Sequence, residues 1–109
     1  MIIIAFEDEG LHGTCVNLER AEQAYGSVSA AALVTFLSDA ESLESVEELM
    51  GVMGEEIIIL PDDSLSVAIG SDYRAALVVV GTRHALDASG RIVWSSVARL
   101  KLLAISRVP

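Results

Sequence analysis

The sequence is poor in cysteine, proline and aromatic residues, and it has no long apolar run. Its 109 residues include one Cys, two Pro and 5% aromatic residues. The lone Cys15 cannot form an internal disulfide, which favours a reducing, cytoplasmic compartment. No apolar run approaches the roughly 18 residues of a membrane-spanning helix, and no basic segment precedes a shorter apolar stretch. We therefore expect neither a membrane span nor a secretory signal.

Basic residues are also scarce. Seven Lys and Arg oppose sixteen Asp and Glu, which gives a formal net charge of −9. Phosphate backbones and anionic membrane surfaces repel such a chain, which excludes a generic basic nucleic-acid binder and predicts no membrane partner and no DNA contact by the chain alone. The acids are concentrated: residues 1–60 hold twelve acids and one base, whereas residues 61–109 hold four acids and six bases.

Apolar residues, in contrast, are abundant. The hydrophobic fraction of 52% is too high for a disordered chain, which combines low hydrophobicity with high charge. A length of 109 residues fits one compact domain. We therefore expect a single folded domain over residues 1–109.

The first half of the chain predicts one strand and three helices. Residues 1–6 are apolar and β-branched, as in a strand. Apolar side chains then recur every three or four residues on one face of a helix that ends at Gly26: Leu11, Cys15, Leu18, Ala21 and Tyr25. A second helix, N-capped by Ser27, extends to about residue 40 and is apolar nearly all round. The capping box over residues 45–48 begins a third, short helix.

The second half of the chain predicts four further strands. Their residue ranges are 55–60, 65–69, 74–80 and 100–105, and the continuously apolar third range predicts a central strand buried on both faces. A long loop over residues 81–99 contains turn residues at 87–90. The pattern as a whole predicts an α+β domain in which an N-terminal strand and a helical pair pack on a mainly antiparallel sheet of about five strands.

The order of these elements and three short segments resemble a known family. Tyr25 and Gly26 separate the first two helices, residues 72–77 read Asp-Tyr-Arg-Ala-Ala-Leu, and residues 90–97 read Gly-Arg-Ile-Val-Trp-Ser-Ser-Val before the last strand. In these segments, and in nearly the whole chain, the protein resembles the RelE/ParE toxin superfamily, and in particular its HigB-like "killer protein" branch.

The resemblance implies a ribosome-dependent mRNA endonuclease, or in the ParE branch a gyrase poison, that an antitoxin holds inactive. Such a nuclease needs no metal, because cations stabilise the scissile phosphate while another group moves the proton of the attacking 2′-hydroxyl. Arg74 matches the strand arginine of the branch, Arg107 is a displaced cation, and His84 is a candidate proton-transfer group. We expect no cofactor and no metal.

The sequence departs from the branch at two catalytic segments. Residues 58–63 read Ile-Ile-Leu-Pro-Asp-Asp where the branch often has His-x-Leu-Lys-Gly-Asp-Arg, so two carboxylates replace cations. Residues 106–109 read Ser-Arg-Val-Pro in place of a C-terminal Asp-Tyr-His. Carboxylates repel a phosphate at close range. These departures favour a catalytically weak or inactive relative that acts through protein binding.

Other polar residues have two interpretations each. Arg91, Arg99 and Lys101 are candidate RNA-binding residues. Residues 99, 101 and 107 would share one face of the last strand if that strand has no bulge. Alternatively, these cations form a solvated face that pairs with the acidic residues of positions 1–60. Arg74 is either a phosphate contact or the partner of Asp72 or a helix carboxylate. His12 and Cys15 provide too few ligands for a closed metal site, which favours a buried thiol.

The apolar second helix predicts a protein interface. Its apolar surface is too broad for one buried face, and such patches mark contacts with partners. The candidate partner-binding residues are Ala32, Leu33, Phe36 and Leu37, and the expected partner is an antitoxin-like protein or a second copy of the chain. Two alternatives stay open: an active endonuclease that contacts ribosomes and mRNA, and a structural or regulatory homo-oligomer unrelated to toxins.

Overall fold

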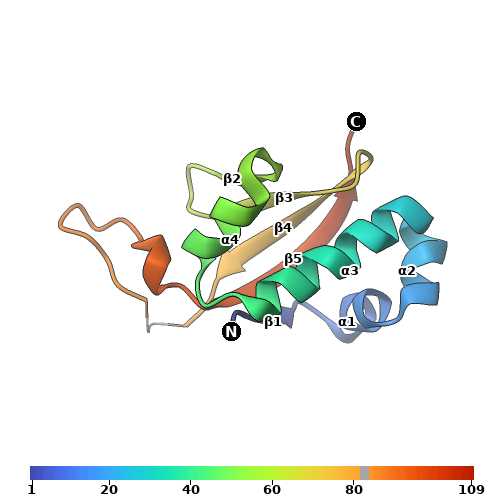
Figure 1. The fold of residues 1–109 in the computed structure, drawn as a ribbon, viewed down its shortest axis with the longest axis horizontal. Coiled ribbons are helices and arrows are strands. Elements are labelled where there is room, and N and C mark those ends of the chain that lie inside the picture. Colours follow the sequence, from blue (N-terminus) through green and yellow to red (C-terminus); the bar gives the residue numbers. More distant parts are fainter. Residues whose placement is uncertain (82–83) are drawn as a thin grey trace.

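The computed structural model describes residues 1–81 and 84–109 of the chain. The described residues form an α+β domain around a five-stranded sheet of order β1-β5-β4-β3-β2 (Figure 1). The predicted fold class is therefore confirmed. The strands are β1 (Ile3–Phe6), β2 (Ile57–Ile59), β3 (Leu65–Ile69), β4 (Tyr73–Val79) and β5 (Arg99–Arg107).

The first and last strands of the chain are neighbours in the sheet. β1 pairs with β5 in parallel, with Ile4 opposite Leu100, whereas β2 to β5 form an antiparallel meander. Parallel neighbours require a long crossover connection, which here includes all the helices and three strands. β1 and β2 are consequently the two edges of the sheet.

The predicted helix over residues 11–25 is two helices, α1 (Glu9–Val16) and α2 (Leu18–Tyr25). The single-helix prediction is wrong at Asn17, whose backbone is extended and whose side chain accepts a hydrogen bond from the Arg20 N–H at 3.1 Å. This bond caps the N-terminus of α2, where Asn is among the preferred residues. The predicted end at Tyr25 and Gly26 is confirmed.

Helix α3 (Ser27–Ser42) follows at once. Its N-cap is Gly26, with φ of 86°, and no side chain caps it, so the predicted cap at Ser27 is one residue too late. Leu33 and Phe36 are fully or almost fully buried in the core, together with Ala30 and Ala40. The expectation that Leu33 and Phe36 form a partner surface is thus corrected: the sheet of the same molecule covers them.

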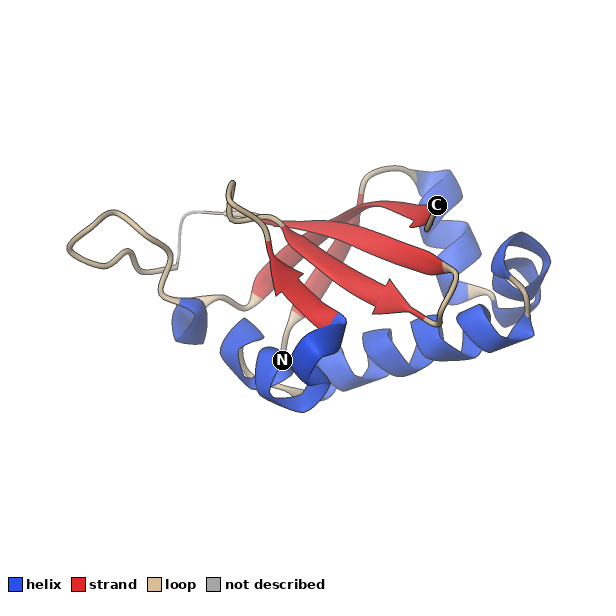
Figure 2. Cartoon of the chain, turned by 90° about the horizontal axis from the view of Figure 1, so that it is seen from above, coloured by secondary structure: helices blue, strands red, loops and turns tan. Residues whose placement is uncertain are grey.

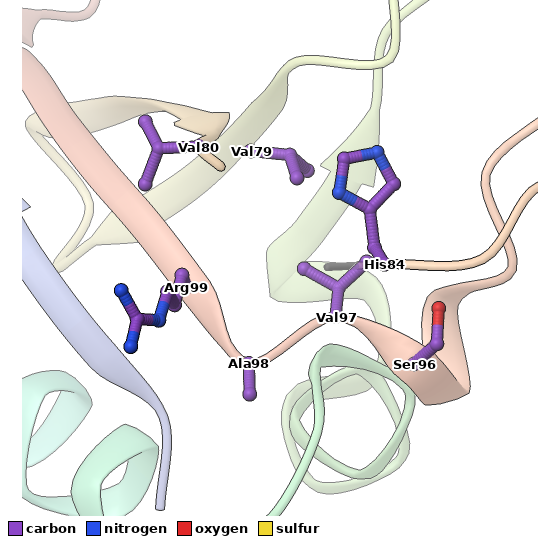
Figure 3. A pocket seen from close by; sticks show the side chains of 7 residues that line it. All are labelled: Val79, Val80, His84, Ser96, Val97, Ala98 and Arg99. Atoms are coloured by element: carbon purple, nitrogen blue, oxygen red, sulfur yellow. The ribbon is translucent and has the colours of Figure 1, made fainter. Parts of the chain in front are cut away.

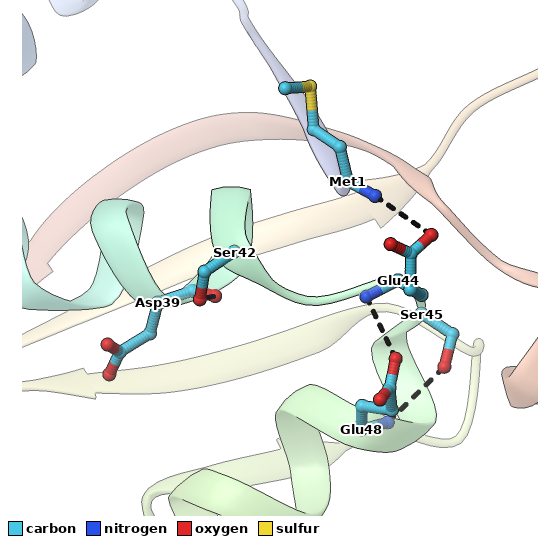
Figure 4. Close-up of polar contacts among 6 residues, drawn as sticks. All are labelled: Met1, Asp39, Ser42, Glu44, Ser45 and Glu48. Atoms are coloured by element: carbon cyan, nitrogen blue, oxygen red, sulfur yellow. Dashed lines mark hydrogen bonds and ion pairs between the residues drawn. The ribbon is translucent and has the colours of Figure 1, made fainter.

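The short helix α4 (Val46–Met53) is N-capped by Ser45 as predicted. The Glu48 N–H donates to the Ser45 hydroxyl at 3.4 Å, and the Glu48 carboxylate accepts from the Glu44 N–H at 2.8 Å (Figure 4). The Met1 ammonium forms an ion pair with Glu44 at 3.2 Å. These contacts hold the chain between α3 and α4 close to the N-terminus.

Helices α3 and α4 lie on the same side of the sheet (Figure 2). The face toward them carries the fully buried strand residues, among them Leu65, Val67, Leu77, Leu100 and Leu102. The prediction that residues 74–80 are buried on both faces is wrong, because Ala76 on the opposite face is exposed and Val78 is only half-buried. β4 is central within the sheet, but helices cover only one of its sides. No helix in the described residues is long and apolar enough to cross a membrane.

Candidate functional site

Arg74 lies on the open face of β4, the face away from α3. Its Nε donates to the Ser66 hydroxyl at 2.6 Å and its Nη2 donates to the Ser66 carbonyl at 3.1 Å. The interpretation in which Arg74 pairs with Asp72 or a helix carboxylate is wrong, because the guanidinium contacts Ser66 on β3 instead. Ser66 uses two of the five guanidinium N–H donors. Among the described residues Arg74 has no carboxylate partner, so its charge is available to an external anion.

Arg107 lies on the opposite face from Arg74. The register between β4 and β5 shifts between Ala76 and Leu77, which pair with Ala104 and Leu102, so Leu103 is an extra residue. A bulge of this kind reverses the alternation of side chains along a strand. Arg107 therefore lies opposite Tyr73 in the sheet, with its Cζ atom 5.9 Å from the centre of the Tyr73 ring. The prediction that residues 99, 101 and 107 share a face is wrong.

Tyr73 links Arg107 to the helical layer. Its ring meets that of Tyr25 on α2 edge to face, with the centres 5.0 Å apart. Edge-to-face pairs are favourable because the ring edge is positive and the ring face negative. A cation over the ring adds a further contact. These contacts link Arg107 at the end of β5 to α2 through Tyr73.

His84 lies at the other end of β4 from Arg74. It lines a cavity of about 130 Å³ whose wall is mostly apolar and includes Val79, Val80, Val97 and Ala98 (Figure 3). Val79 lies five positions after Arg74, a distance of about 17 Å along an extended strand. The three candidate catalytic residues therefore do not come together in one site.

The candidate RNA-binding residues differ in their surroundings. Arg99 and Lys101 alternate with the buried Leu100 and Leu102, so they share the open face with Arg74. The Lys101 ammonium pairs with Glu7 at 3.1 Å, as the alternative interpretation of a face paired with the acidic half predicts.

Arg91 lies away from this face, on the connection between β4 and β5. It pairs with Asp63 in the β2–β3 turn at 2.6 Å. Around it the predicted turn is confirmed: the Gly90 N–H donates to the Asp87 carbonyl at 3.0 Å and Leu86 bridges to Ile92. This ion pair joins two loops and uses the charge of Arg91 inside the molecule.

The β2–β3 turn is acidic and contains Asp62 and Asp63. The Ser64 hydroxyl and N–H both donate to Asp62, at 2.5 and 3.0 Å, and these bonds lower the pKa of its carboxyl. Asp62 therefore stays ionised across the neutral range. A phosphate at this turn would meet negative charge.

Cys15 is buried, and burial raises the pKa of its thiol to about 11. A thiol with such a pKa is neutral at physiological pH and is a poor metal ligand and nucleophile. His12 packs instead against the ring of Phe6, with the centres 4.9 Å apart. In the part of the chain that the structure describes, no group of three His, Cys, Asp or Glu is arranged to hold a metal ion.

A larger groove, which the sequence patterns did not predict, lies between α3, α4 and the end of β3. Its volume is about 300 Å³, and it is lined by Ala32, Thr35, Phe36, Asp39, Val52, Met53, Glu56, Ala68 and Gly70. One signal in the sequence points to it: Asp39 is the first charged residue after Glu22, on a helix whose preceding positions are mostly apolar. We call this site the α3–α4 groove.

Comparison of the chain with protein-family models, curated proteins and solved structures finds no significant match. The described residues form an α+β domain whose central strands are covered by helices on one side, with separated candidate catalytic residues and an acidic groove.

Proposed function

We propose that the chain is a toxin-like component of a cytoplasmic toxin–antitoxin or derived module, and that it acts by binding protein rather than by cleaving RNA. The separation of Arg74, His84 and Arg107 carries this proposal. Attack of a 2′-hydroxyl on its own phosphate needs a proton acceptor and a phosphate-binding cation within hydrogen-bond reach of the same nucleotide. Arg74 and Arg107 lie on opposite faces, and His84 lies at the other end of β4.

Two further features support the proposal. An N-terminal strand, consecutive helices and a β-meander are the arrangement that the resemblance to the toxin superfamily implies. Exposed apolar side chains are available for a partner on α3, α4 and β2: Val28, Val34, Val52, Ile58 and Ile59. Ala32 and Leu37, two of the four candidate partner-binding residues, are half-buried on α3.

The proposal is tested by incubating the purified chain with translating ribosomes and a reporter mRNA and mapping the cleavage ends. We expect no cleavage above that of a buffer control. Because any surviving phosphate contact would depend on its free guanidinium, Arg74→Ala is the matched variant. Cleavage by the wild type that Arg74→Ala abolishes would overturn the proposal.

A second candidate function, the active ribosome-dependent endonuclease, is favoured by one observation. Arg74, Arg99 and Lys101 share the open sheet face, where RNA could lie across β4 and β5. This function predicts growth arrest when the chain is expressed alone, and relief by Arg74→Ala. Normal growth at a confirmed expression level counts against it.

A further inference from the structure

The α3–α4 groove combines an apolar wall with two carboxylates. Ala32, Val52 and Met53 supply apolar surface above the buried Phe36, and Val52 is 60% exposed. A volume of about 300 Å³ lies at the lower end of the range for binding pockets, roughly 300–1,000 Å³. The groove is thus large enough for a few side chains.

The carboxylates of the groove have no cation of their own. Asp39 is half-buried and Glu56 is exposed; no Lys, Arg or His lines the groove, and neither acid forms an ion pair with a residue that the structure describes. Figure 4 shows the Asp39 carboxylate directed away from the Met1, Glu44 and Glu48 contacts. Two negative charges beside apolar surface favour a cationic ligand and disfavour RNA or an acidic peptide.

β3 also extends beyond the end of β2 at the groove. β2 pairs with β3 only as far as Val67, so Ala68 and Ile69 have no strand beside them on that side. An exposed strand edge binds extended peptides through main-chain hydrogen bonds. Gly70 at the groove lies close to α3, because a Cβ atom there would lie 2.9 Å from the Ser29 hydroxyl oxygen. The occupant therefore lies along β3 and meets α3 at this end.

We propose that the α3–α4 groove binds an extended segment of a partner protein that carries apolar side chains and at least one Lys or Arg. This inference rests on the proposed protein-binding function and names the chemistry of the partner. Charge complementarity decides among occupants, because a second copy of the chain also carries a net charge of −9. The basic side chain contacts Asp39 and Glu56, and the apolar side chains contact Val52 and Met53.

The test uses a phage library of random nine-residue peptides selected on the full-length chain. We expect enriched peptides to contain Lys or Arg beside apolar residues and to shift the amide resonance of Gly70. Asp39→Lys with Glu56→Lys should weaken their binding about tenfold or more, because attraction becomes repulsion. The control, Glu19→Lys with Glu22→Lys on exposed α2, changes the net charge equally and should leave binding within about twofold.

The neutral double variant, Asp39→Asn with Glu56→Gln, keeps the test valid if the charge-reversal variant fails to fold. Its peptide binding should fall in proportion to the lost charge. Enriched peptides without basic residues, equal binding to the reversed variant, or no enrichment would each overturn the inference. The proposed function fails separately, if Arg74-dependent cleavage of mRNA is seen. If the chain cleaves no mRNA and its peptide binding does not depend on the groove residues, only the inference about the groove is refuted and the proposed function stands.

Discussion

The burial and ion pairing of single residues depend on the layer of the fold in which they lie. Cys15 and His12 are three positions apart on α1, yet the thiol is buried and the imidazole is exposed beside Phe6. Arg74 keeps free donors on the open face, whereas Arg91 and Lys101 are paired with carboxylates. Of the three cations on the open face, only Lys101 is therefore paired with a carboxylate among the described residues.

The buried thiol predicts a loss of stability at alkaline pH. Because the pKa of Cys15 rises from 9.0 to about 11 on folding, the unfolded state ionises first. Its contribution to stability is complete below about pH 9 and is lost as the pH rises to about 11. We expect the free energy of unfolding, measured in urea, to fall by about 2–3 kcal/mol across this window.

Cys15→Ala is the control, because it removes this ionisation while other alkaline titrations remain. The decline between about pH 9 and pH 11 should be shallower in this variant than in the wild type. Identical slopes would show that the thiol does not titrate differently in the folded and unfolded chain.

At the scale of elements, local signals place most helix ends. Gly26, with φ of 86°, separates α2 from α3, and Ser45 begins α4 as the capping pattern predicts. Asn17 has a less obvious role, because it lies in the middle of a continuous apolar period. Its cap interaction divides that period into α1 and α2 and lets the chain turn there.

Asn17→Ala should destabilise the domain by about 1 kcal/mol, because the Arg20 N–H loses its acceptor at the start of α2. Urea denaturation measures the change. Asn17→Asp preserves an acceptor and should stay within about 0.5 kcal/mol of the wild type. Equal losses for both variants would show that the cap is not the cause.

At the scale of the whole molecule, α3 joins the helical layer to the sheet. Its buried side uses Leu33 and Phe36, so the surface left for partners is formed by other positions of the helix, such as Val34. This division follows from the one-sided sheet, because α3 covers the only face of β3 to β5 that is strongly apolar.

Leu33→Ala and Val34→Ala test this division with adjacent residues. Leu33 has no exposed surface, so its truncation should cost about 2–5 kcal/mol, whereas Val34 is 39% exposed and should change stability by about 0.5 kcal/mol or less. Thermal and urea unfolding measure both. A larger loss for Val34→Ala would contradict the packing described for α3.

Much of the fold follows from local patterns, and the candidate site does not. Strand and helix periods, the break at Gly26 and the cap at Ser45 depend on residues close in sequence, so they were predictable. Asp39 and Glu56 lie on different elements, and only the packing of α3 against α4 and β3 joins them in one groove. The sequence patterns predicted neither residue as part of a site.

The sequence by itself determined the α+β class, the concentration of acid in residues 1–60 and the absence of Lys and Arg at residues 58–63, since these depend on composition and short-range periodicity. Only the tertiary structure decided which face each cation occupies. The extra residue at Leu103 reverses the alternation along β5, so Arg107 leaves the face of Arg74. Strand register depends on contacts between distant segments, and one added residue moves every later side chain to the other face.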